Sequence, residues 1–160
     1  MYIPNVLTRT QFGDPVLRKV AQKLSDEEIK SDDIQRLIAD IKHTLLSRKY
    51  GVGLAAPQVG FSVALSVILI RSTPARLDRE HFESVIINPV YKGLGSRKPK
   101  WEGCLSLGAK NSPIFAQAER FERIQAAWTD EQGKMHEEVI TGLPAHVFQH
   151  ETDHLNGVCV

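Results

Sequence analysis

The sequence has few cysteines, no long hydrophobic run and no excess of either charge. Its two cysteines, Cys104 and Cys159, are too few for a disulfide framework. The longest apolar stretch, residues 63–70, has the length of a strand and is too short for a transmembrane helix. The 20 basic residues balance 19 acidic ones, so there is no electrostatic signal for binding nucleic acid or an acidic membrane surface. The first residues lack a basic start and an apolar core, so we expect no signal peptide.

The length and composition are typical of one globular domain. A chain of 160 residues can bury a hydrophobic core but is short for two ordinary domains. Hydrophobic residues make up 42% of the chain and charged residues 24%, which are normal values for a globular protein. The sequence shows no repeat, low-complexity tract or linker. We therefore predict a single domain over residues 1–160.

Local patterns predict helices and strands that do not alternate regularly. Asp14 followed by Pro15 is typical of a helix start, and a second helix should begin at Ser31 or Asp32 because apolar residues recur at helical spacing from 34 to 45. Further predicted elements are strands over 61–71 and 84–91, a hairpin of 123–128 with 135–139, and a helix over 143–156. This order favours an α+β fold with antiparallel or mixed β-sheets around the C-terminal helix.

The predicted C-terminal helix carries an HExxH motif at residues 150–154. His150 and His154 would lie one turn apart on one helix face, where both imidazoles can bind one metal ion. Glu151 between them can reach a water bound to such a metal. The alternative is a solvated helix that carries two histidines and two acids.

A catalytic site of this kind needs a third protein ligand. The metzincin pattern would place a histidine at position 160, which is Val160, and the sequence ends six residues after His154. We therefore expect the third ligand upstream. Cys104 is the best candidate because a thiolate is a strong ligand for a soft or borderline ion, although a buried core cysteine is the alternative. His136 lies in an exposed, charged stretch, and His146 is better placed to line the site than to join it.

The segment from Gly51 to Gln58 is small and apolar. Its glycines would allow a ligand to come close to the backbone, and the Gln58 amide could donate to a developing oxyanion. The alternative is a tight turn between a helix and a strand.

Together these segments resemble peptide deformylase. The family motif G-x-G-x-A-A-x-Q is matched at 51–58, E-G-C-L-S at 102–106 and H-E-x-D-H at 150–154, in the same order and with similar separation. The segment 13–18 also resembles the family's G-D-P-x-L-R sequence, so that the resemblance covers nearly the whole chain.

The resemblance implies a metal centre and a set of catalytic residues. Cys104, His150 and His154 would bind one divalent ion, with Fe(II) expected and Zn, Ni or Co possible. Glu151 would act as general base and then as general acid. The metal-bound water would remove the formyl group from N-formyl-methionine of newly made polypeptides and release formate.

The resemblance also implies supporting roles. The oxyanion hole would consist of the Gln58 amide and the backbone N–H of Leu105, while Glu102 and Arg120 would form an ion pair. Residues expected at the substrate are Gly53, Val52, His146 and Val147.

The resemblance also implies partners and a cellular location. Substrates would be N-formyl-methionyl nascent peptides, with possible proximity to the ribosome. A thiolate ligand beside Fe(II) is prone to oxidation, which favours the reducing cytoplasm. We expect a monomer. Two alternatives stay open: an HExxH metalloprotease or other amidase, and a non-catalytic binder of formylated N-termini.

Overall fold

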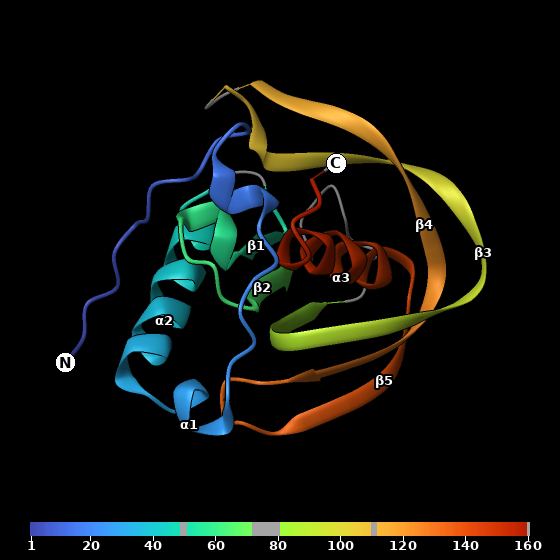
Figure 1. Cartoon of the computed structure of the whole chain (residues 1–160). Helices are drawn as coiled ribbons and strands as arrows, with labels where there is room; N and C mark the ends of the chain where they lie inside the picture. Colours follow the sequence, from blue (N-terminus) through green and yellow to red (C-terminus); the bar gives the residue numbers. More distant parts are fainter. Residues whose placement is uncertain (49–50, 72–80, 110–111, 160) are drawn as a thin grey trace.

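The computed structural model describes residues 1–48, 51–71, 81–109 and 112–159 (Figure 1). Within these residues, five antiparallel strands form one sheet in chain order. The strands are β1 (Gly53–Ala55), β2 (Leu65–Ile70), β3 (Phe82–Ala109), β4 (Ser112–Thr129) and β5 (Met135–Thr141). The helices are η1 (Pro15–Arg18), α1 (Asp26–Ile29), α2 (Asp32–Leu46), η2 (Ala56–Val59) and α3 (Gly142–Leu155). The predicted α+β class, with an antiparallel sheet and a C-terminal helix, is confirmed. None of the described helices is long and apolar enough to cross a membrane.

Helix α2 begins where the sequence predicts. The Ser31 hydroxyl caps it by accepting a hydrogen bond from the Ile34 N–H. The negative charges of Asp32 and Asp33 in the first turn interact favourably with the positive end of the helix dipole. The apolar residues at helical spacing, including Ile41 and Leu45, are buried against β1 and β2. The N-terminal segment runs alongside this helix (Figure 1).

The ribbon of β3 and β4 is much longer than the predicted strands, and it curves around α3 (Figure 1). None of residues 91–103 of β3 is buried, and charged residues are mixed there with exposed apolar ones such as Trp101, so the alternation of apolar and polar residues is weak. The register between the two strands is irregular between Gly103 and Gly108, which places the predicted cysteine ligand in a bulged region. Conversely, β2 is shorter than the predicted strand over 61–71.

The segment 51–58 forms regular structure and is not the simple tight turn that was the alternative interpretation of its sequence. It contains the short strand β1 and the 3-10 turn η2, whose residues are buried. At the other end of the sheet, the predicted hairpin of β4 and β5 is confirmed. Asp130 closes its turn by accepting hydrogen bonds from the N–H groups of Gln132 and Lys134.

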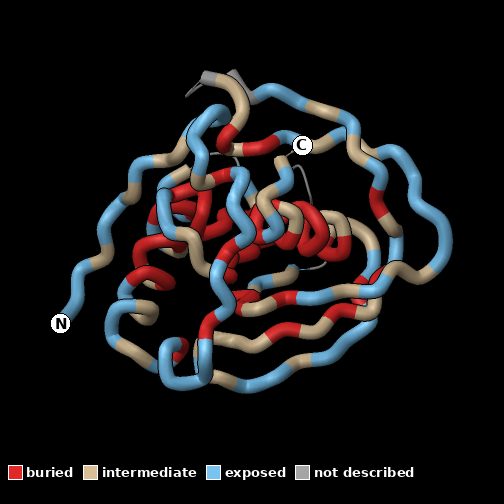
Figure 2. The backbone as a smooth tube through the Cα atoms, in the orientation of Figure 1, coloured by how far each residue is buried: buried red, intermediate tan, exposed pale blue. Residues whose placement is uncertain are grey.

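Helix α3 lies at the centre of the fold, and most of its residues are buried (Figure 2). Phe148 is fully buried among apolar residues of β2, β3, β4 and β5. The helix ends just before Gly157, whose φ of +74° suits glycine and stops the helix as predicted. The central position of α3 explains why polar residues of the HExxH motif are buried in the interior.

Candidate active site

Three potential metal ligands meet between β3 and α3. The Cys104 Sγ lies 3.3 Å from the His154 Nε2, which in turn lies 3.1 Å from the His150 Nε2. All three residues are buried. A tetrahedral ion with bonds of about 2.0–2.3 Å separates its ligand atoms by roughly 3.3–3.6 Å. The three ligand atoms all lie within 4.8 Å of one another, so small side-chain movements would let them surround one ion. The donor set of one thiolate and two imidazoles suits Zn or another transition metal.

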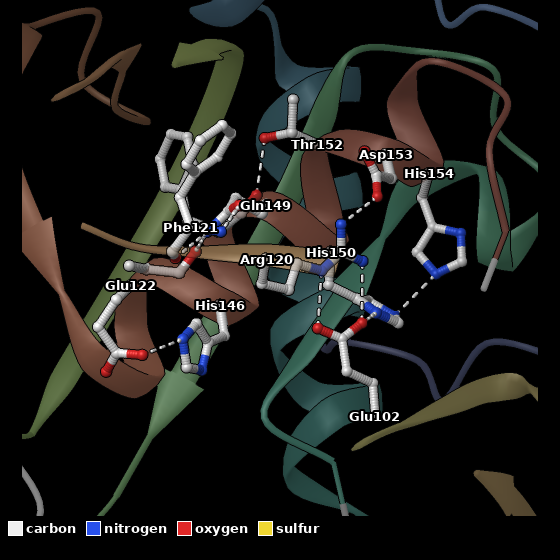
Figure 3. Close-up of polar contacts among 12 residues, drawn as sticks. Glu102, Arg120, Phe121, Glu122, His146, Gln149, His150, Thr152, Asp153 and His154 are labelled. Carbon is white, nitrogen blue, oxygen red and sulfur yellow. Dashed lines mark hydrogen bonds and ion pairs between the residues drawn. The ribbon is translucent and has the colours of Figure 1, made fainter. Parts of the chain in front are cut away.

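A network of charged groups orients the first histidine (Figure 3). The His150 Nδ1 lies 2.9 Å from the Glu102 Oε2, which leaves the Nε2 free to face the other two ligands. Arg120 donates two hydrogen bonds to Glu102, at 2.7 and 2.9 Å, and a third to Asp153 at 2.5 Å. Burial raises the pKa of Glu102, but hydrogen bonds from Arg120 and His150 outweigh this effect and lower it to about 2. Glu102 therefore stays ionised at neutral pH.

Glu151 is buried beside the first strand. An added Cβ at Gly53 would lie 2.2 Å from the Glu151 Oε1, so only glycine leaves room for this carboxylate. The Oε2 is buried and has no hydrogen-bond partner among the described residues. Burial raises the pKa of Glu151 to about 7, although a protonated His150 would act in the opposite direction. A carboxyl group with this pKa can both accept and donate a proton near neutral pH.

Gln58 approaches the candidate ligand Cys104 from η2. Its Oε1 accepts a hydrogen bond from the Ala55 N–H at 2.9 Å, which fixes the side chain and turns the Nε2 donor toward the site. The Nε2 lies 3.6 Å from the Cys104 Sγ and 3.2 Å from the Ser106 Oγ. Leu105 lies beside Cys104 in the bulged part of β3, and its carbonyl accepts a hydrogen bond from Arg9 at 2.7 Å.

The residues predicted to line a substrate pocket lie near the start of α3 and before β1. Val147 is buried in the apolar cluster around Phe148, and Val52 packs against the same cluster. The His146 Nε2 lies 3.4 Å from the Glu122 Oε2 on β4 (Figure 3). Burial lowers the pKa of His146.

The structure separates His136 from the candidate ligands. Its ring stacks on Trp128 with centroids 5.1 Å apart, and its Nε2 lies 2.6 Å from the Asp130 Oδ2. The position predicted for a metzincin third histidine, Val160, lies outside the described residues.

Sequence reasoning missed three supporting residues. Asp153, within the HExxH motif, completes the charged network by binding Arg120. Gln149 ties α3 to β4: its amide accepts from the Phe121 N–H at 2.9 Å and donates to the Phe121 carbonyl at 2.8 Å. Arg9 reaches Leu105 from the N-terminal segment. Asp153 had a sequence signal as the fixed acid of the H-E-x-D-H motif, although no role was predicted for it, while Gln149 was marked only by its position next to His150.

Comparison with known proteins gives concordant matches. A model of the family described as polypeptide deformylase matches residues 7–160. The chain is 40% identical over 157 residues to peptide deformylase 1 of Bifidobacterium longum, covering 95% of this chain and 70% of the relative. It is 39% identical over 152 residues to peptide deformylase of Thermotoga maritima, covering 93% and 81%. A Met-Ala-Ser-bound crystal structure of class I type b peptide deformylase from Acinetobacter baumannii superposes with a TM-score of 0.87 at 33% identity, covering 98% of this chain and 97% of that one.

Proposed function

This chain belongs to the polypeptide deformylase family, whose members remove the formyl group from N-formylmethionine, and from this premise we propose how its own residues perform the reaction. The chain is a metal-dependent hydrolase of this kind. The observation that carries the assignment of roles is the buried cluster of Cys104, His150 and His154 with the unpartnered carboxylate of Glu151 beside it.

The three clustered residues would hold the metal, which we propose to be Fe(II), with Zn, Ni or Co as possible substitutes. When bound, the ion acts as a Lewis acid and lowers the pKa of a coordinated water, which provides a nucleophile near neutral pH. Cys104 contributes a thiolate, while Glu102 fixes the tautomer of His150 so that its Nε2 can act as a ligand.

Glu151 moves the proton. Its carboxylate takes a proton from the attacking water, and the new C–O bond forms at the formyl carbon. The same residue then gives this proton to the departing nitrogen as the C–N bond breaks, because an amide nitrogen leaves poorly as an anion. The products are formate and a peptide with a free N-terminus. The raised pKa of Glu151, about 7, suits both steps.

Gln58 and the Leu105 N–H would stabilise the negative charge that develops on the formyl oxygen. The Gln58 amide is held by the Ala55 N–H before the substrate binds, so little reorganisation is needed during the reaction. Loss of one such donor typically lowers the rate by about 100- to 1,000-fold.

N-formyl-methionyl nascent peptides are the proposed substrates. The similar Acinetobacter baumannii protein was crystallised with Met-Ala-Ser, a peptide that begins with methionine. Val52 and Val147 offer apolar surface for a methionine side chain, and His146 would border it. Gly53 is proposed to contact the peptide backbone. We further propose that residues 1–160 act as one monomeric domain in the cytoplasm, close to the ribosome.

A formate-release assay tests this function. The chain is purified without oxygen, its metal content is measured, and formyl-Met-Ala-Ser is supplied as substrate. We expect stoichiometric metal and release of formate, whereas Glu151→Gln should bind the metal equally and lose activity by at least about 100-fold. Cleavage of internal bonds in an unformylated protein would instead favour a metalloprotease. Binding of the formylated peptide without formate release would favour a non-catalytic binder.

A further inference from the structure

The segment that carries Cys104 and Leu105 is not held by regular strand pairing. The register of β3 and β4 is irregular between Gly103 and Gly108, so the sheet alone does not fix these peptide groups. Buried backbone carbonyls nevertheless need hydrogen-bond donors. The position of the Leu105 N–H is critical for the proposed oxyanion hole, since donors must lie within a few tenths of an ångström of their working positions.

The N-terminal segment supplies these donors. We call residues 7–12 the N-terminal strap. The Thr10 N–H donates to the Gln58 carbonyl at 2.7 Å, and the Phe12 N–H donates to the Ser106 carbonyl at 2.9 Å. The Arg9 Nη1 donates to the Leu105 carbonyl at 2.7 Å. The strap therefore contacts both residues of the proposed oxyanion hole, although these residues come from η2 and β3.

The strap is itself anchored away from the site. The Leu7 N–H donates to the Thr44 Oγ1 of α2 at 2.8 Å, and the Arg18 guanidinium lies 5.2 Å from the centre of the Phe12 ring. Before the strap, the Tyr2 hydroxyl and the Asn5 N–H both donate to the Asp40 carboxylate. The contacts to Thr44 and Asp40 tie this segment to α2, and Phe12 packs against η1, so the backbone that carries Arg9 is held on both sides.

Among the described residues, Arg9 is the only one whose side chain donates a hydrogen bond to the Leu105 carbonyl. It is partly buried, and burial together with the nearby Arg48 lowers its pKa, while the charge of Cys104 acts in the opposite direction. An arginine nevertheless stays charged at neutral pH. A hydrogen bond from a charged donor is stronger than one from a neutral donor, which suits a contact that must hold a bulged backbone.

We propose that Arg9 is a positioning residue for the deformylation reaction: it holds the Leu105 carbonyl, which belongs to the peptide group after Leu105, and so limits the rotation of this residue. Restricting Leu105 in turn keeps its N–H, in the preceding peptide group, directed toward the formyl oxygen. Arg9 does not touch the substrate in this role. The inference rests on the proposed function, because it assigns Leu105 to the oxyanion hole. The contact between Arg9 and the bulged segment can be tested by a measurement that does not depend on enzyme activity.

Four proteins test the proposal: the wild type, Arg9→Met, Arg9→Lys and the control Tyr2→Phe, each loaded with Co(II). Tyr2→Phe removes only the hydrogen bonds of the Tyr2 hydroxyl to Asp40, while the Asn5 and Leu7 N–H groups still anchor the segment to α2 and Arg9 is unchanged. In Arg9→Met we expect kcat for formyl-Met-Ala-Ser to fall about 10- to 100-fold with KM within about threefold of the wild type, since a misplaced Leu105 N–H weakens binding of the transition state more than binding of the substrate. Arg9→Lys, which keeps a charged donor, should recover most of kcat. The absorption of the Co(II)–thiolate bond should be equal in all four proteins.

Amide hydrogen exchange gives the readout that does not depend on activity. We expect exchange across residues 104–107 to rise at least about tenfold in Arg9→Met and to stay unchanged in Tyr2→Phe. The proposal is overturned if exchange is the same in Arg9→Met and the wild type, if kcat changes less than twofold, or if Tyr2→Phe lowers kcat equally. A wild type that releases no formate would contradict the proposed function, while hydrogen exchange would still report on the contact between Arg9 and Leu105.

Discussion

At the residue scale, Gly53 and Glu151 are mutually dependent. The glycine is not explained by its backbone angles, since its φ is not in the left-handed region. It is explained by the carboxylate, because a Cβ would lie 2.2 Å from the Oε1 and 2.7 Å from the Cδ of Glu151. The sequence pattern suggested that Gly53 meets the substrate, and the structure adds a second reason for glycine at this position.

Gly53→Ala should therefore impair catalysis more than stability. The methyl group would push the Glu151 carboxylate away by an ångström or more, and a displacement of about 1 Å can cost roughly 100-fold in rate. We expect kcat to fall by about that factor while metal content stays stoichiometric. Gly95→Ala is a useful control for the loss of a glycine, because a Cβ there has open space, although its φ of +99° adds strain. Full activity in Gly53→Ala would show that Glu151 can move without loss.

The proposed ligands were accessible to sequence reasoning at this scale. The spacing of His150 and His154 predicts that they share a helix face, and the structure brings both Nε2 atoms together. Arg9 was not accessible, because its partner Leu105 lies 96 positions away and no periodic pattern links them. Contacts of this kind depend on how separate elements pack.

At the element scale, Gln149 connects the central helix to the sheet. Its side chain makes two hydrogen bonds with the backbone of Phe121 on β4, and its amide also donates to the Ala145 carbonyl at 2.9 Å (Figure 3). Gln149 is 1% exposed, so water cannot replace these partners. This contact fixes α3 against β4 one residue before His150 and one residue after Arg120.

Gln149→Leu should destabilise the fold. The change leaves the partly buried N–H and carbonyl of Phe121 without their side-chain partner, and an unsatisfied polar group in the interior costs about 1–3 kcal/mol. We expect the free energy of unfolding in urea to fall by about 2–4 kcal/mol. Gln125→Ala is the matched control, because Gln125 hydrogen-bonds to Glu137 in an exposed position and should change stability by less than about 0.5 kcal/mol. Equal effects of the two changes would refute a special role for Gln149.

The elements differ in how well the sequence predicts them. Helices α2 and α3 were predicted nearly to their ends, because caps, helical spacing and Gly157 are local signals. The long ribbon of β3 and β4 was predicted only in part. Its outer half has exposed apolar residues such as Trp101 and Phe115 mixed with charged ones, so no alternation marks its length. Its pairing is set by contacts between strands, which local patterns do not contain.

At the scale of the whole molecule, a buried charged network links the proposed metal site to global stability. Glu102 and Arg120 are both largely buried and join β3 to β4, while Asp153 connects them to α3. Removing one member leaves an uncompensated charge inside the protein, which typically costs about 3–5 kcal/mol. The exposed pair of Lys100 and Glu122, at 3.1 Å, should contribute less than about 1 kcal/mol.

This network predicts how stability depends on acid. The pKa of Glu102 is about 2 in the folded protein and 4.5 in the unfolded chain, so the folded state favours the ionised form of this carboxyl group. Because the folded pKa is the lower one, the carboxylate stabilises the fold above pH 4.5, and this contribution is lost as the pH falls toward 2. A difference of this size corresponds to about 3 kcal/mol.

We therefore expect the free energy of unfolding of the metal-free protein to fall by about 3 kcal/mol between pH 6 and pH 2 through this group alone. Urea unfolding of the wild type and Glu102→Gln, both in excess chelator, isolates the contribution. The variant should be less stable at pH 6, and the difference between the two proteins should shrink as the pH falls, because the wild-type carboxyl group then becomes neutral as well. A difference that stays constant from pH 6 to pH 2 would mean that Glu102 stabilises the fold through its shape and packing rather than its charge, and the role of Arg120 as its counter-ion would have to be abandoned.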